Sequence, residues 1–147
     1  MAVKNGVSLN WGGLDKALSK AGHKLGDTQA LMESVGDALV SGTLKRFDAE
    51  EEPTGKKWPK SKRAAKEGGQ TLTDKAFLRR SIDSAATPEK VMVGSNLPYA
   101  RIHQLGGKTG KGHKVDMPAR PYLGVSESDR DDVRAAMANF LAGAFKA

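Results

Sequence analysis

Apolar and polar positions near the start of the chain follow the spacing of a short strand and then a helix. Val7 to Trp11 alternates apolar and polar residues, which predicts a strand ended by Gly12-Gly13. Apolar residues then recur at helical spacing through 14–25. Gly22 and Gly26 weaken that second element, because glycine lowers helix stability.

The strongest periodic pattern is an amphipathic helix that starts after Asp27 or Thr28. Either side chain can cap the helix by accepting from a free N–H group of its first turn. The helix should end near the acidic residues at 48–52, since Pro53 disfavours helical backbone at the residue before it. Its apolar stripe consists of Leu31, Val35, Leu39 and Phe47, widened by Val40 and Leu44.

Residues 53–70 have the composition of an exposed connection. Pro53-Thr54-Gly55 is typical of a turn, and Gly68-Gly69 closes the stretch. Between these ends lies a basic run that contains Trp58 and no acidic residue. Its cationic residues are Lys56, Lys57, Lys60, Lys62, Arg63 and Lys66.

The centre of the chain predicts a small antiparallel sheet. Residues 72–82 indicate a short helix that passes into a strand near 81–85. Val91 to Gly94 is rich in β-forming residues and should pair with that strand as a hairpin. Pro98 can then start a helical turn over 99–105, ended by glycines.

The last third of the chain predicts a loop, an extended segment and a helix. Residues 106–114 form a glycine- and lysine-rich loop with little to bury, so we expect it to be exposed and mobile. Prolines hold 117–123 extended. Ser126 or Ser128 caps a final helix that begins with Asp129, Asp131 and Asp132 and carries an apolar stripe. We predict an α+β fold: one domain over 1–147, with amphipathic helices on a small antiparallel sheet and a C-terminal helix.

Composition restricts the function further. The 147 residues include no cysteine, which excludes disulfides and thiolate chemistry. No run approaches the ~20 apolar residues of a membrane-spanning helix, and no signal peptide is visible, so we expect a soluble protein made in the cytoplasm. A formal net charge of +7 favours contact with nucleic acid or with an acidic protein surface.

Candidate catalytic and ligand-binding patterns are incomplete. Gly107-Lys108-Thr109 ends like a phosphate-binding loop, but Ile102 stands where the first glycine belongs. His103, His113 and Asp116 lack the spacing of a helix-borne metal pair. No serine lies in a Gly-x-Ser-x-Gly turn, and the acidic groups at 48–52 and 129–132 have the pattern of solvated helix ends. We therefore expect no enzyme, cofactor, metal or small-molecule substrate.

The basic run around Trp58 allows two interpretations. Its cations could bind a phosphate backbone while the indole ring stacks on a base. Alternatively, the run is a solvated loop whose tryptophan packs onto the core. We favour the second interpretation, because one aromatic ring makes a poor stacking platform. Lys56, Lys57, Lys60, Lys62 and Arg63 remain the candidate contacts for DNA or an acidic partner.

Four sequence blocks, taken together, resemble the Mu-like phage virion morphogenesis family, also called the tail-completion family. The most specific are Tyr99-Ala100-x-x-His103-Gln104-x-Gly106-Gly107 and Met117-Pro118-Ala119-Arg120-Pro121-Tyr122-Leu123-Gly124. The others are Arg46-Phe47 with Pro53-Thr54-Gly55-Lys56 and Trp58-Pro59, and Leu72-Thr73-Asp74 with Leu78, Ser81 and Ile82. The resemblance covers about residues 28–145.

The resemblance implies a structural subunit at the junction of head and tail, with no catalytic residues. It singles out positions that define the fold or an interface: Phe47, Trp58, Tyr99, His103, Gly106, Arg120 and Pro121. We expect assembly in the host cytoplasm into a homo-oligomeric ring within the virion neck, contacting connector and tail proteins, with DNA in its channel. The alternative is a small basic nucleic-acid-binding protein. Neither the number of subunits nor the side of the junction follows from the sequence.

Overall fold

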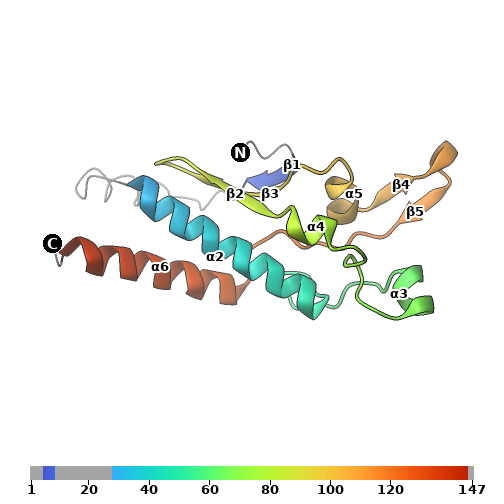
Figure 1. Cartoon of the computed structure of the whole chain (residues 1–147), viewed down its shortest axis with the longest axis horizontal. Coiled ribbons are helices and arrows are strands. Elements are labelled where there is room, and N and C mark those ends of the chain that lie inside the picture. The colour runs from blue at the N-terminus through green and yellow to red at the C-terminus, as the bar shows by residue number, and fades with distance from the viewer. Residues whose placement is uncertain (1–4, 9–27, 146–147) are drawn as a thin grey trace.

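A computed structural model of the chain describes residues 5–8 and 28–145, and in them helices pack with two small antiparallel sheets (Figure 1). The predicted α+β fold is confirmed. Most of the strand expected from Val7 and the helix expected over 14–25 lie outside the described residues. In chain order the elements are β1 (Asn5–Ser8), α2 (Thr28–Ala49), α3 (Lys62–Glu67), α4 (Phe77–Arg80), β2 (Asp83–Ala86), β3 (Val91–Ser95), α5 (Ala100–Leu105), β4 (Gly107–Thr109), the 3-10 turn η1 (Lys111–His113), β5 (Val115–Met117) and α6 (Glu127–Phe145).

Helix α2 is the centre of the fold, because it lies between α6 and the three-stranded sheet (Figure 1). Its predicted stripe is buried, from Leu31 to Phe47. Two glycines allow close approach on its two contact faces. A Cβ at Gly36 would lie 2.7 Å from Ser84 Oγ of β2, and one at Gly42 would overlap the Asp129 carboxylate of α6. The long helix therefore supports both neighbouring layers.

Strand β3 is the middle of the three-stranded sheet, with β1 and β2 antiparallel on either side. Val93 lies opposite Val7 on one side and Ser84 on the other. Val91 and Val93 are buried in the core with Ile82. The predicted hairpin of β2 and β3 is thus confirmed.

The stretch predicted as an irregular loop over 106–114 is largely paired. Gly107 lies opposite Met117 and Thr109 opposite Val115, so β4 and β5 form a second hairpin. Gly110 and Gly112 make the turn with φ angles of 78° and 69°. A period-two apolar pattern was missing because this hairpin is largely exposed and has little apolar surface to bury.

Most residues of the connection over 53–70 are exposed, but the stretch also contains buried residues and a short helix. Trp58 and Ala64 are buried, and residues 62–67 form the short helix α3. Ser61 caps this helix, since its Oγ accepts from Ala64 N at 3.1 Å. In α6, Ser126 acts as predicted, because its Oγ accepts from Asp129 N at 3.0 Å.

Helices of the described residues include none that is both long and apolar enough to cross a membrane. The two long helices lie at one end of the elongated molecule, whereas α3 and the β4–β5 hairpin lie at the other (Figure 1).

Candidate functional site

An aromatic cluster anchors the segments that the sequence analysis singled out. The ring of Phe47 lies edge-on to that of Trp58, with centroids 5.5 Å apart, and 5.3 Å from that of Tyr122. Trp58 Nε1 donates to Pro121 O at 2.8 Å. With only 6% of its surface exposed, Trp58 lies in the core, as in the interpretation we favoured. Its ring is therefore not available to stack on a base.

A buried ion pair lies next to this cluster. Arg46 Nη1 contacts Asp129 Oδ2 at 2.5 Å, and Arg46 Nε donates to Tyr122 O at 2.8 Å. Arg46 Nη2 also donates to Thr43 Oγ1 and to Gly124 O, both at 3.1 Å. Asp129 was expected at a solvated helix end, but its side chain is 2% exposed. The signal that could have found this pair is Arg46 itself, a charge directly before Phe47 on an apolar stripe.

Gln104 connects α5 to the extended segment that follows the β4–β5 hairpin. Its Oε1 accepts from Tyr122 N at 3.0 Å and from Leu123 N at 2.9 Å, while Nε2 donates to Leu123 O at 3.1 Å. The amide side chain therefore pairs with the extended backbone as a neighbouring strand would. Sequence reasoning quoted Gln104 within the family block but assigned it no role.

Arg120 connects the same extended segment to the 53–70 connection. Its Nε donates to Pro59 O at 2.6 Å, and its backbone N donates to His103 O at 2.8 Å. The guanidinium thus binds a backbone carbonyl of the connection. Burial lowers the pKa of Arg120 from its usual value. Gly106 is needed nearby, since a Cβ there would lie 2.6 Å from Ala119 N.

A cleft of about 300 Å³ opens between α3, α4, α5 and β5. Two aromatic rings on its walls are unusually accessible, with Phe77 60% and Tyr99 40% exposed. Tyr99 and His103 meet edge-on, with ring centroids 6.0 Å apart, which agrees with their spacing on one helical face. The lining residues are Ser61, Arg63, Leu72, Asp74, Lys75, Ala76, Phe77, Leu78, Tyr99, His103, Met117 and Arg120.

His103 is a half-buried titratable group in the cleft wall. Desolvation by burial, followed by the positive charge of Arg120, lowers the pKa of His103 below its usual value of 6.5. The imidazole is therefore neutral at pH 7. Its Nδ1 is buried without a hydrogen-bond partner among the described residues.

The wall of the cleft also contains backbone in an uncommon conformation. Leu72 and Ala76 have φ angles of 62° and 58°, a region that residues other than glycine rarely adopt. Arg63 Nη1 lies 3.9 Å from Asp74 Oδ1 at the rim, and Arg63 Nη2 donates to Gln70 O at 2.7 Å. With its aromatic walls and a rim of Arg63, Lys75 and Asp74, the cleft suits an apolar segment that carries a carboxylate.

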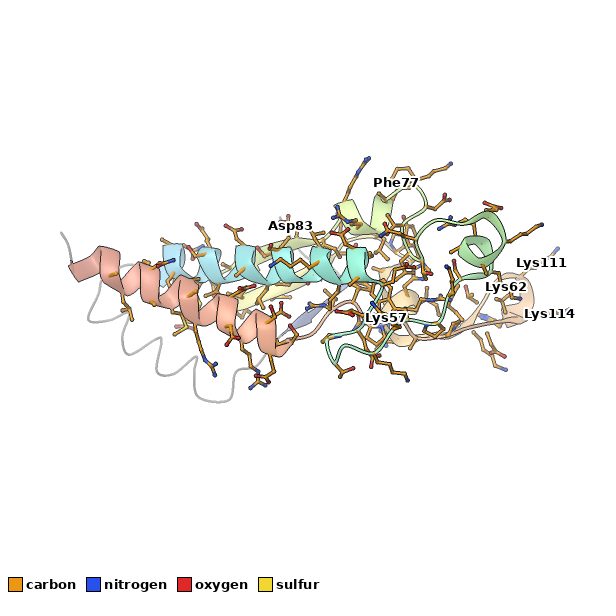
Figure 2. The ribbon with its side chains drawn as sticks, turned by 90° about the horizontal axis from the view of Figure 1, so that it is seen from below. Lys57, Lys62, Phe77, Asp83, Lys111 and Lys114 are labelled. Atoms are coloured by element: carbon orange, nitrogen blue, oxygen red, sulfur yellow. The ribbon has the colours of Figure 1, made fainter. Side chains whose placement is uncertain are left out.

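The five candidate cations of the basic run do not form one patch. Lys57 lies nearer the long helices, where its Nζ donates to Ala49 O at 2.7 Å and pairs with Glu51 at 3.2 Å. Lys62 lies at the far end of the molecule, the end that also carries Lys111 and Lys114 (Figure 2). Lys56 and Lys60 are exposed, and Arg63 lines the cleft. Residues 5–8 and 28–145 contain no group of three acidic or histidine residues that could hold a metal.

Comparison with known proteins places these features in a phage context. The sequence profile of the phage virion morphogenesis family matches residues 9–142. "Mu-like prophage FluMu G protein 2" of Haemophilus influenzae is 34% identical over 120 residues, covering 82% of this chain and 83% of that protein. "Putative capsid assembly protein G" of Escherichia phage Mu is 28% identical, covering 99% of both chains. No solved structure shows a significant match.

Proposed function

Because this chain belongs to the phage virion morphogenesis family, we propose that it is a tail-completion or neck subunit at the head–tail junction of a tailed phage. Family membership itself assigns a structural role in building the phage particle. The finer proposal is that copies of the chain form a ring that contacts connector and tail proteins. The observation that carries it is the family match over residues 9–142, nearly the whole chain.

Exposed aromatic side chains support the proposal that copies of the chain assemble with one another. Phe77 and Tyr99 present large apolar side chains at a cleft, whereas a monomer gains nothing from exposing them together. Aromatic residues are enriched at the energetically important positions of protein interfaces. We infer that the cleft is a subunit contact and that its occupant is a second copy of this chain.

Charge complementarity favours a copy of the chain as that occupant. Three cationic residues line the cleft: the exposed Lys75, the half-buried Arg63 and the buried Arg120. The outer surface of the two long helices is acidic, and exposed or half-exposed carboxylates there outnumber the exposed cations Lys45, Arg130 and Arg134. Those carboxylates are Glu33, Asp37, Asp48, Glu127, Asp131 and Asp132.

A contact between two different surfaces repeats from copy to copy. Such head-to-tail contacts close into rings when their rotation closes. The cleft at one region and the acidic helix pair at another are two different surfaces of one chain. A ring built this way would fit the proposed position at the head–tail junction.

The proposal is tested by removing the protein from the phage that encodes it and imaging the particles by electron microscopy. We expect heads and tails that are not joined, and recovery of infectious particles when the gene is supplied in trans. Normal tailed particles in the absence of the protein would contradict the proposal. So would a failure to find the protein in purified virions.

Two matched variants test the cleft. Phe77→Ser alters an aromatic wall of the cleft, whereas Leu105→Ser alters an equally exposed apolar residue outside it, at 61%. We expect Phe77→Ser alone to lower the mass of the assembled protein measured by light scattering and to reduce complementation. Equal effects of the two variants would remove the cleft from the interface.

The alternative function, a small basic nucleic-acid-binding protein, rests on the net charge of +7. It predicts an affinity for nucleic acid that falls steeply with salt and is abolished when Lys56, Lys57, Lys60, Lys62 and Arg63 are replaced by Ala. Presence of the protein in purified virions, together with unjoined heads and tails in its absence, separates the proposed function from this alternative.

A further inference from the structure

Two lysine-bearing segments lie at the same end of the molecule although they are far apart in the sequence. One is α3 and the other is the β4–η1–β5 hairpin (Figure 1). Side chains labelled in Figure 2 place Lys62, Lys111 and Lys114 at this end of the molecule, away from the long helices. We call α3 and the hairpin the two basic prongs. The cleft described above lies between their bases.

Amines on the prongs are exposed and lack carboxylate partners. Within residues 5–8 and 28–145, no carboxylate lies within 4.0 Å of Lys62, Lys108, Lys111 or Lys114, and all four are exposed. By contrast, the exposed cations of the helix pair do have carboxylate partners, as in Lys45 with Asp132 at 3.7 Å. The prongs therefore carry exposed amines without an ion-pair partner, although other exposed cations of the described residues, such as Lys56, Lys60 and Lys90, also lack one.

We propose that the two basic prongs bind the phosphate backbone of double-stranded DNA without reading its sequence. Lysine is depleted in the cores of protein interfaces, whereas it is a common phosphate contact in DNA complexes. The prongs offer long, freely rotating amines, and β4 and β5 have little apolar surface to bury. These features fit an evenly charged polyanion better than a shaped protein surface.

The proposed contact uses partly different lysines from those that the sequence indicated. The sequence pointed to the run of Lys56 to Arg63, but Lys57 is paired with Glu51 and Arg63 lines the cleft. Lys108, Lys111 and Lys114, on the other prong, join Lys62 instead. This inference adds duplex DNA as a ligand of the protein. It rests on the proposed function only for where in the particle the DNA would be met.

Binding of the full chain to a fluorescently labelled DNA duplex, measured by anisotropy between about 50 and about 200 mM salt, tests the inference. The test variant combines Lys62→Gln, Lys108→Gln, Lys111→Gln and Lys114→Gln. The control combines Lys45→Gln, Lys90→Gln, Arg130→Gln and Arg134→Gln, and removes the same charge from exposed positions elsewhere. Circular dichroism and urea unfolding check that both variants fold.

We expect wild type and control to bind with a steep salt dependence. The log–log slope should decrease in magnitude by about 0.9 for each phosphate contact that the prong variant loses. Its affinity at low salt should fall by roughly tenfold or more. Equal losses in both variants, or no binding at low salt, would overturn the inference.

Binding to two further ligands, single-stranded DNA and polyglutamate, distinguishes duplex DNA from other possible partners of the prongs. Tighter binding to single-stranded DNA that is lost in Phe77→Ser would indicate base stacking in the cleft and would overturn the duplex assignment. Prong-dependent binding to polyglutamate as tight as binding to DNA would indicate an acidic protein partner and would also overturn it. These measurements use isolated protein, so the inference can fail while the particle phenotype stands, and the reverse.

Discussion

Arg46 and Asp129 form a buried ion pair between α2 and α6, with Nη1 and Oδ2 2.5 Å apart although the two residues are 83 positions apart in the chain. Their side chains are 6% and 2% exposed, so the pair is shielded from solvent. Asp129 Oδ2 also accepts from Ser126 N at 2.9 Å, which fixes the start of α6. The Asp129 carboxylate therefore holds α6 against α2 and also caps the first turn of α6.

Asp129→Asn should destabilise the protein strongly. Removing one partner of a buried pair leaves the other charge uncompensated, and such changes cost about 3–5 kcal/mol. The matched control is Asp132→Asn, whose partner Lys45 is 68% exposed, and it should cost less than about 1 kcal/mol. Urea unfolding followed by circular dichroism measures both free energies. Similar costs for the two variants would show that the buried pair does not hold α6 to α2.

Two glycine-to-alanine changes should differ in their effect on stability, because only one of them is destabilising. Gly106 has a φ of 69°, and its new Cβ would lie 2.8 Å from Met117 O, so Gly106→Ala must move backbone and should lower the melting temperature. Gly143 lies in α6 with nothing within 4 Å of a new Cβ. Gly143→Ala should leave stability unchanged or raise it by up to about 1 kcal/mol, because alanine is the better helix former. A tolerated Gly106→Ala would contradict the close packing of α5 on the extended segment.

Removal of the Tyr122 hydroxyl should be costly, whereas removal of the Tyr99 hydroxyl should not be. Tyr122 is fully buried, its hydroxyl donates to Ala100 O at 2.8 Å, and burial raises its pKa well above the usual value. Tyr122→Phe leaves that carbonyl without its donor, at a cost of about 1–3 kcal/mol. Tyr99→Phe changes a 40% exposed ring and should unfold at the same urea concentration as wild type. Equal unfolding midpoints for wild type and Tyr122→Phe would count against this hydrogen bond.

Mild acid should destabilise the fold through His103. Burial, aided by Arg120, lowers the pKa of His103 in the folded state, so the unfolded chain binds the proton more readily. The contribution of neutral His103 to stability is fully present above the pKa of about 6.5 that the residue has in the unfolded chain. It decreases as the pH falls from there toward the lower pKa of the folded state. Unfolding free energies measured at about pH 7.5 and about pH 5 should differ less in His103→Gln than in wild type. His113→Gln is the control and should retain the wild-type dependence.

Periodic patterns in the sequence were sufficient for the elements that present an apolar face. The stripe from Leu31 to Phe47 predicted α2, because helical spacing of apolar residues reports burial on one face. The β-forming residues of Val91 to Gly94 predicted the central strand. The family resemblance identified Arg120 and Gly106 as important positions. Their contacts could be described only from the folded structure. The β4–β5 hairpin was missed because its strands bury little apolar surface.

The sequence by itself determined the fold class, the family and the two long described helices, since local spacing and short motifs encode them directly. Only the tertiary structure decided how distant residues combine. It placed Trp58 in the core, paired Arg46 with Asp129, separated Lys57 from Lys62 and brought Lys62 to the same end as Lys111 and Lys114. Such placements depend on how the layers pack against one another, and no local pattern of charge or hydrophobicity records that packing.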